Sequence, residues 1–137
     1  MSRLCRVGRA AMADMLAHAR DEAPNECCGL VLGTADFAER AVRCRNLLQS
    51  PTRFLLDPAD HLAALKATRG STQSVVGVYH SHPQTAPVLS ETDRLEAAYP
   101  EYVHLIVSPS ADPAHGEIRA YSFDRGNFFP LELVPVG

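Results

Sequence analysis

Long apolar runs, clusters of basic residues and Cys-x-x-Cys pairs are all missing from this chain of 137 residues. A membrane-spanning helix needs about 20 consecutive apolar residues, and since no stretch is that long, we expect no membrane partner. The first residues alternate Arg3, Arg6 and Arg9 with apolar positions, so they lack the apolar core of a secretory signal. The 13 basic residues are dispersed among 16 acidic ones, with a net charge of -3, which predicts no nucleic-acid partner.

The cysteines are not arranged as a metal-binding knuckle or a disulfide framework. Cys27 and Cys28 are neighbours in the sequence and cannot easily bridge each other on an extended strand. We predict buried thiols of a cytoplasmic protein at Cys5, Cys27, Cys28 and Cys44. A nucleophilic role for Cys27 or Cys28 would need a nearby base, which the sequence does not exclude.

The length and an apolar share of 46% suffice for one domain with a packed core, and no internal repeat divides the chain. Apolar residues at helical spacing predict helices, and short apolar or alternating runs predict strands. The predicted helices cover 9–21, 58–69 with Asp57 as N-cap, and 93–99, and the predicted strands cover 4–7, 28–32, 37–46, 74–79, 102–108, 117–123 and 128–134. The last two strands are expected to be antiparallel edge strands. Residues 1–137 are therefore predicted to form a single α/β domain, with helices flanking a mixed β-sheet.

Two histidines stand at the end of the apolar strand 74–79. Residues i and i+2 of an extended chain project from the same face, so His80 and His82 point together while Ser81 points away. Two imidazoles in this arrangement are candidate ligands of one metal ion. The other histidines lack ligand spacing and are expected to be structural or exposed: His18, His61, His104 and His115.

A third candidate ligand follows on the predicted short helix. Ser90 has the position of an N-cap, which places Asp93 in the first turn. The ten residues 83–92 form a loop long enough to return the Asp93 carboxylate to the imidazoles. Three protein ligands that leave a fourth position to water are typical of catalytic zinc, whereas structural zinc sites have four ligands, usually including cysteine. The pattern thus predicts a catalytic metal centre, although non-haem iron oxygenases also use two histidines and a carboxylate.

These residues resemble the signature of the JAMM (MPN-plus) zinc metallopeptidases, which is an upstream Glu, then His-x-His-Pro, then Ser-x-x-Asp. The signature is matched without insertion or deletion by His80, His82, Pro83, Ser90 and Asp93. The segment 26–33 is similar to the family's Glu-x-Cys-Gly strand, and the segment 51–58 resembles that of its bacterial members. The resemblance covers most of the chain and implies an α/β/α architecture similar to that of the cytidine deaminases.

The resemblance also assigns roles to particular residues. It implies one zinc ion per chain, with a water molecule as fourth ligand, held by His80, His82 and Asp93. It places the family's catalytic glutamate at Glu26 as the general acid/base. Glu22, at the end of the preceding predicted helix, is our fallback for this role. It gives Ser90 an oxyanion-stabilising role that is compatible with capping the helix.

The implied activity is the hydrolysis of peptide or isopeptide bonds. The chain is similar to compact bacterial members and has little room for the insertions with which ubiquitin-chain-specific relatives hold a second ubiquitin. A narrow entry beside the metal favours small residues, such as the Gly-Gly that ends bacterial ubiquitin-like sulfur carriers. We therefore predict cleavage after the Gly-Gly tail of such a carrier, with release of cysteine or a C-terminal extension.

Other functions are compatible with parts of the pattern. General deubiquitinase-like or endopeptidase activity on other proteins is one alternative, and a metal-binding scaffold without catalysis is another, although a scaffold would normally lose part of the ligand set. The DNA-repair branch of the superfamily typically has His-Asn-His-Pro-Ser-Gly, where this chain has His-Ser-His-Pro-Gln-Thr. A zinc nucleoside deaminase would need a Pro-Cys-x-x-Cys segment, which is absent. The oligomeric state is not predicted.

Overall fold

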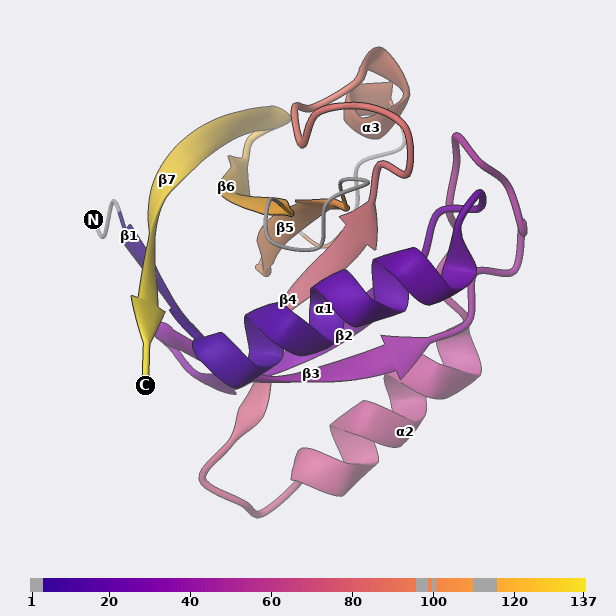
Figure 1. Cartoon of the computed structure of the whole chain (residues 1–137). Coiled ribbons are helices and arrows are strands. Elements are labelled where there is room, and N and C mark those ends of the chain that lie inside the picture. The colour runs from indigo at the N-terminus through magenta and orange to yellow at the C-terminus, as the bar shows by residue number, and fades with distance from the viewer. Residues whose placement is uncertain (1–3, 96–98, 100, 110–115) are drawn as a thin grey trace.

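The computed structural model describes residues 4–95, 99, 101–109 and 116–137. The polypeptide alternates strands and helices in a way that matches the α/β prediction (Figure 1). The elements are β1 (Leu4–Gly8), α1 (Arg9–Glu22), β2 (Cys28–Thr34), β3 (Phe37–Cys44), α2 (Pro58–Thr68), β4 (Ser74–Ser81), α3 (Glu91–Leu95), β5 (Val103–Ser108), β6 (Glu117–Asp124) and β7 (Asn127–Val136).

The strands form one mixed sheet in the order β1-β3-β2-β4-β5-β6-β7, and this sheet closes on itself because β7 also pairs with β1. The pairs β1–β3, β1–β7 and β4–β5 are parallel, and the remaining neighbours are antiparallel. The predicted antiparallel pairing of β6 with β7 is confirmed. The prediction that these two are edge strands is wrong, since β6 also pairs with β5, and β7 pairs with β1 from Leu4↔Glu132 to Gly8↔Val136. The first and last strands of the chain meet only in the folded protein, and local patterning carries no signal for such a pair.

The two longer helices cover opposite faces of the sheet (Figure 1). Met15 of α1 packs in one buried cluster with Val31 of β2 and Tyr79 of β4. Leu30 of β2 belongs to a second buried cluster, which includes Ala64 of α2. Because β2 is buried on both faces, its sequence is a continuous apolar run rather than an alternating one. The mixed sheet flanked by helices therefore agrees with the fold class predicted from the sequence.

The ends of several elements follow local sequence signals. The Asp57 side chain caps α2 by accepting a hydrogen bond from the Ala59 N–H (2.9 Å), and Pro58 opens the helix as predicted. Arg125 and Gly126 both have positive φ (50° and 81°), which gives the tight turn predicted between β6 and β7. The predicted extension of α3 toward Tyr99 includes residues 96–98, and most of the predicted turn 112–116 likewise lies outside the described residues.

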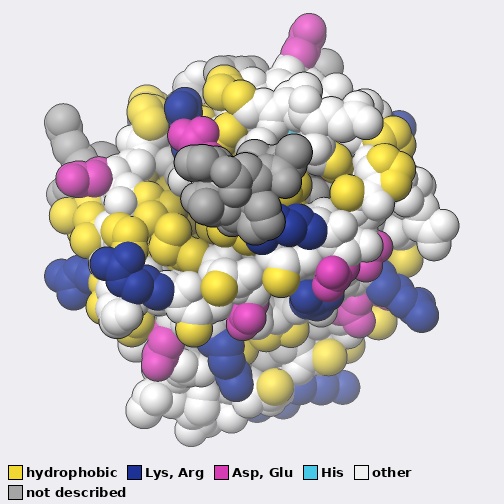
Figure 2. Space-filling view, in the orientation of Figure 1, with side chains coloured by type: hydrophobic (Ala, Val, Ile, Leu, Met, Phe, Trp, Pro, Cys, Tyr) yellow, Lys and Arg dark blue, Asp and Glu magenta, His cyan; other side chains and the backbone are white. Residues whose placement is uncertain are grey.

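Charged side chains are dispersed over the face of the molecule in Figure 2, where Lys and Arg alternate with Asp and Glu. This distribution agrees with the absence of a basic stripe in the sequence. Among the helices described here, none has both the length and the apolar character needed to cross a bilayer.

Candidate metal centre

The end of β4 positions the two histidines of the candidate centre. His80 lies inside β4, which is held between β2 and β5, and His82 is the residue just beyond the strand. The backbone N–H of His82 donates to the Val107 carbonyl oxygen (2.8 Å), which continues the pairing with β5. The Ser81 hydroxyl accepts a hydrogen bond from the Cys27 N–H (2.8 Å). The two histidines are thus carried by a fully paired, rigid part of the sheet.

The start of α3 positions the third candidate ligand. The Ser90 hydroxyl oxygen accepts a hydrogen bond from the Asp93 N–H (3.0 Å), and Asp93 Oδ2 accepts one from the Ser90 N–H (3.0 Å). This reciprocal pair is a capping box with aspartate at its third helical position. The prediction that Ser90 is the N-cap and Asp93 lies in the first turn is confirmed. Because the cap holds the Asp93 carboxylate at the helix end, it also directs that carboxylate toward β4.

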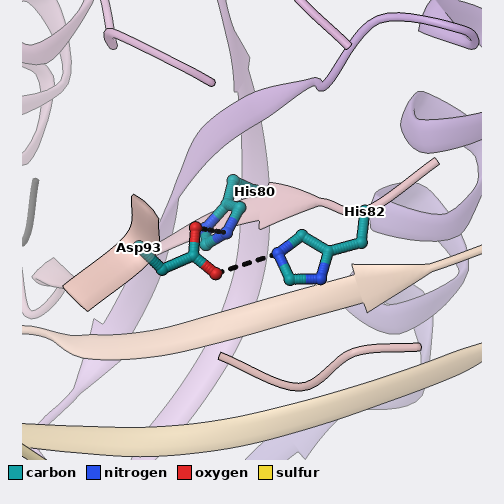
Figure 3. Close-up of side chains that lie close together, drawn as sticks. All are labelled: His80, His82 and Asp93. Atoms are coloured by element: carbon teal, nitrogen blue, oxygen red, sulfur yellow. Dashed lines mark hydrogen bonds and ion pairs between the residues drawn. The ribbon is translucent and has the colours of Figure 1, made fainter. Parts of the chain in front are cut away.

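The three side chains meet in a buried cluster (Figure 3). Asp93 Oδ1 lies 3.1 Å from His80 Nε2, and Asp93 Oδ2 lies 2.9 Å from His82 Nε2. One potential ligand atom from each residue lies within 4.8 Å of the other two. No other group of this kind is found among the described residues. The arrangement that the sequence predicted from spacing is therefore present in space.

The electrostatics of this cluster favour a positive charge beside Asp93. His82 Nδ1 lies 2.9 Å from the Ala86 carbonyl oxygen, and because a carbonyl only accepts, Nδ1 carries the hydrogen and Nε2 faces Asp93. Burial lowers the pKa of His82, but its hydrogen bonds to Asp93 and Ala86 raise that pKa above its ordinary value overall. Burial raises the pKa of Asp93, yet the close contacts with His80 and His82 hold it far below its ordinary value. A proton or a metal cation bound beside Asp93 would supply the positive charge that these pKa shifts favour.

The surroundings of His80 indicate whether the three side chains could hold a metal ion. Its ring stacks on Phe54, with ring centroids 4.5 Å apart and an interplanar angle of 18°. His80 Nε2 is buried and approaches Asp93, but it makes no hydrogen bond of acceptable geometry with any described residue. A buried nitrogen without a hydrogen-bond partner lowers the stability of the fold unless a bound ligand interacts with it. Two imidazole nitrogens and one carboxylate are a donor set that transition-metal ions prefer, so the residues fit a metal.

Glu26 lies just before β2 and is buried, with 4% of its surface exposed. Its backbone is fixed on both sides, because its N–H donates to the Ser50 carbonyl oxygen (2.8 Å) and its own carbonyl accepts from Asn46 Nδ2 (3.1 Å). Its charge contributes to the raised pKa of His82, after the larger effects of burial, Asp93 and Ala86. Glu22, the fallback in the sequence analysis, is exposed at the end of α1. The structure thus buries Glu26, rather than Glu22, next to Cys27, which is hydrogen-bonded to Ser81 between the two histidines.

Asn46 is an organising residue that the sequence analysis missed. Its Oδ1 accepts hydrogen bonds from the N–H groups of Leu48 and Leu55 (both 3.0 Å). Its Nδ2 donates to the carbonyl oxygens of Glu26 (3.1 Å) and Arg53 (3.0 Å). These four bonds use the full hydrogen-bonding capacity of the amide, and they join the backbone of Glu26 to the loop that presents Arg53. No sequence motif distinguishes this asparagine from an ordinary loop residue.

The cysteines do not fit the nucleophile alternative. Cys5, Cys27, Cys28 and Cys44 are all free and buried, which confirms the prediction of buried thiols. Burial raises the pKa of Cys27 to about 11, and burial also raises the pKa of Cys28 well above its usual range. A thiol that stays protonated at neutral pH is a poor nucleophile.

The other histidines that the structure describes have structural partners, as predicted. Three are held by hydrogen bonds to tyrosines: His18 to the Tyr79 hydroxyl (2.7 Å), His61 to the Tyr102 hydroxyl (2.8 Å) and His104 to the Tyr99 carbonyl oxygen (3.2 Å). His115 lies outside the described residues.

Two cavities adjoin the candidate metal ligands and Glu26, and they differ in size and polarity. The apolar pocket has a volume of ≈ 80 Å³, and His80 and Asp93 line it together with Phe54, Ile106 and Phe128. The polar cleft has a volume of ≈ 600 Å³ and is lined by acidic, basic and amide side chains, including Glu22, Glu26, Arg45 and Asn46. Two of the three candidate ligands, His80 and Asp93, thus border one cavity, and Glu26 borders the other.

A mixed sheet between helices, with a buried His-His-Asp cluster at the end of a central strand, defines a small α/β domain with a candidate catalytic metal centre. A family model described as "Prokaryotic homologs of the JAB domain" matches residues 8–124. The chain belongs to this family, the prokaryotic branch of the JAMM hydrolases, and it is a JAMM-type peptidase.

Individual proteins agree with this assignment. The chain is 39% identical over 127 residues to a Haloferax volcanii protein named desampylase, with 88% of each chain covered. It is 36% identical over 114 residues to a Mycobacterium tuberculosis protein named CysO-cysteine peptidase, covering 82% of this chain and 77% of that protein. A solution structure of a protein from Desulfitobacterium hafniense matches with a TM-score of 0.87 and 33% identity, covering 97% of this chain and 93% of the other.

Proposed function

We propose that this chain is a zinc peptidase that hydrolyses the amide bond after the C-terminal Gly-Gly of a ubiquitin-like sulfur carrier, releasing cysteine or a C-terminal extension. The observation that carries the proposal is the convergence of ligand atoms of His80, His82 and Asp93 within 4.8 Å of one another, and the burial of Glu26 supports it. The names of two relatives support the substrate class, since one is a desampylase and the other a CysO-cysteine peptidase. The proposed location is the cytoplasm, where buried thiols such as Cys27 and Cys28 stay reduced.

In this proposal one zinc ion per chain is held by His80, His82 and Asp93, and the fourth position is left to water. Zinc in such a site supplies a Lewis acid for the scissile carbonyl and lowers the pKa of its water toward about 7. The Ala86 carbonyl fixes the tautomer of His82, so that Nε2 is the ligating atom. The two hydrogen bonds of the capping box hold the Asp93 carboxylate in position.

Glu26 is proposed to move the protons of the reaction. Hydrolysis adds the oxygen of water to the carbonyl carbon and leaves the two protons of water to be redistributed. Glu26 takes one proton from the attacking water and delivers it to the leaving nitrogen as the carbon–nitrogen bond breaks, and the second proton stays on the new carboxyl group, which then loses it to solvent. The backbone of Glu26, bonded to Ser50 and Asn46, fixes the point from which its buried side chain extends.

Ser90 is proposed to stabilise the oxyanion in addition to capping α3. Its oxygen already accepts the Asp93 N–H, but its hydroxyl hydrogen can still be donated to a developing negative charge. We expect Ser90→Ala to lower the free energy of unfolding by about 1 kcal/mol through loss of the cap. We also expect turnover to fall by ~10²-fold, as for other lost oxyanion donors.

The two roles of Ser90 are separated by measuring both quantities on the same samples. Chemical denaturation gives the stability, and single-turnover cleavage at a temperature where both proteins are folded gives the rate. Ser90→Thr keeps the hydroxyl and is the matched control, which should retain most of both. A stability loss with unchanged turnover would leave Ser90 with the capping role alone.

The substrate assignment is tested by offering the zinc-loaded protein three substrates in parallel. These are a carrier ending in Gly-Gly-Cys, a carrier with a longer extension after Gly-Gly, and unfolded casein as a general protein substrate. We expect intact-mass analysis to find carriers cut back to Gly-Gly while casein stays intact. Rapid cleavage of casein with both carriers untouched would favour a general endopeptidase and would contradict the carrier assignment.

A further inference from the structure

The peptide group between Glu26 and Cys27 is held by side chains on both sides. Its carbonyl oxygen accepts a hydrogen bond from Asn46 Nδ2 (3.1 Å), and its N–H donates to the Ser81 hydroxyl oxygen (2.8 Å). The preceding peptide group is also fixed, because the Glu26 N–H donates to the Ser50 carbonyl oxygen (2.8 Å). Peptide groups are planar, so two fixed groups define the direction in which the Glu26 side chain leaves the backbone.

Ser81 is the member of this arrangement that comes from the strand of the histidines. β2 and β4 lie side by side (Figure 1), and their register pairs Cys28 with His80. Cys27 and Ser81 are the next two residues that face each other in this register. The Ser81 N–H donates to the Cys27 carbonyl oxygen (3.0 Å), as in a regular antiparallel pair, but the Cys27 N–H bonds the Ser81 side chain. The hydroxyl thus takes the place of a main-chain acceptor just before β2 begins.

The position of the Ser81 hydroxyl gives it no direct access to a substrate. Ser81 and Cys27 are both buried. Side chains alternate along β4, so Ser81 lies on the face opposite to that of His80 and His82. An effect of this hydroxyl on the reaction would therefore pass through other residues, and the direct route is the backbone of Cys27 and its neighbour Glu26.

We propose that Ser81 is a positioning residue, whose hydroxyl holds the Glu26–Cys27 peptide group and so couples the acid/base carboxylate to the strand that carries the histidines. This inference rests on the proposed function, in which Glu26 transfers the protons. A displacement of about 1 Å can lower a reaction rate ~10²-fold. Ser81→Ala removes the hydroxyl but keeps the main-chain bond from residue 81 to Cys27, so the strands stay paired while the peptide group loses one of its two side-chain partners.

The rate test is a double-mutant cycle with a carrier that ends in Gly-Gly-cysteine. We expect Ser81→Ala to lower kcat about tenfold or more, with KM and zinc content unchanged. In a Glu26→Gln background the same change should have no further effect on the single-turnover rate, because the residue through which Ser81 acts is already inactive. Ser81→Thr keeps the hydroxyl and should keep most of kcat. Ser81→Val has nearly the same shape as Ser81→Thr but no hydroxyl, and it should lose as much as Ser81→Ala.

Hydrogen exchange followed by NMR gives a measurement that does not depend on turnover. We expect the Cys27 amide to exchange about tenfold or more faster in Ser81→Ala than in the wild type, relative to other amides of β2, and the Glu26 amide to follow it. Thr68→Val in α2 is the control, because it removes another buried hydroxyl, which donates to the Ala64 carbonyl oxygen (2.9 Å). This control should keep the wild-type kcat and the wild-type exchange of the Cys27 amide.

The possible outcomes separate the role of Ser81 from the proposed function. A wild-type kcat in Ser81→Ala, together with slow turnover of Glu26→Gln, would overturn the positioning role and leave the carrier peptidase intact. An equal loss from Ser81→Ala in both backgrounds would mean that Ser81 does not act through Glu26, and unchanged exchange of the Cys27 amide would contradict the proposed hold on the peptide group. If the wild-type enzyme cuts no carrier, the proposed function is wrong and the positioning role falls with it.

Discussion

The double change His80→Ala and His82→Ala is expected to reduce bound zinc from about one ion per chain to none and to abolish turnover. Two of the three candidate ligands are removed, and Asp93 alone cannot hold a transition metal tightly at neutral pH. Elemental analysis of purified protein after dialysis against a weak chelator measures the stoichiometry. Unfolding curves taken on the same sample show whether the variant is still folded.

His61→Ala is a matched control for the double change. His61 is hydrogen-bonded to Tyr102 and lies outside the cluster, so this variant should keep its zinc. If the double variant keeps the wild-type zinc content, the metal site lies elsewhere in the chain. Iron in place of zinc in protein purified without added metal, together with oxygen-dependent chemistry, would instead favour the oxygenase alternative.

Glu26→Gln is expected to keep the fold and the metal but to lower turnover by at least ~10²-fold. Glutamine has nearly the shape of glutamate, so the buried position stays filled, but it can neither accept a proton from water nor deliver one to the leaving nitrogen. Single-turnover cleavage of carrier-cysteine gives the rate, and elemental analysis gives the zinc content. A loss of activity with unchanged metal separates proton transfer from metal binding.

Glu22→Gln is the informative comparison for Glu26→Gln. Glu22 lies on the same cleft but is exposed, and its loss should have a much smaller effect on turnover. A large loss at Glu22 with near-normal turnover of Glu26→Gln would transfer the acid/base role to Glu22. Comparable turnover of both variants and the wild type would remove both carboxylates from the mechanism.

The features that sequence reasoning predicted correctly are those with a local physical cause. The alternation of side chains along an extended strand makes His80 and His82 point together, and the capping preference of Ser90 places Asp93 in the first turn of α3. The N-cap of α2 at Asp57 follows from the same preference. Each of these rules acts over a few residues, so the sequence contains all the information that the rule needs.

Local patterning was less informative about the surroundings of the centre. The pattern of the last strands indicated edge positions, whereas β7 pairs with β1 and closes the sheet. The hydrogen bond from Asn46 to the Glu26 carbonyl oxygen connects segments that are far apart in the sequence, and so does the stacking of Phe54 on His80. Contacts of this kind leave no periodicity or spacing that a single sequence can reveal.

The sequence by itself determined the α/β class and the residues available as metal ligands, because spacing along one strand and one helix start is a short-range property. Only the tertiary structure decided that Glu26 is buried and that Arg53 and His80 line the same apolar pocket. The loop that carries Arg53 is held to Glu26 through Asn46, so this placement arises when segments from different parts of the chain pack together. The identity of the candidate metal ligands thus follows from local spacing, whereas the residues that surround them are brought there by long-range packing.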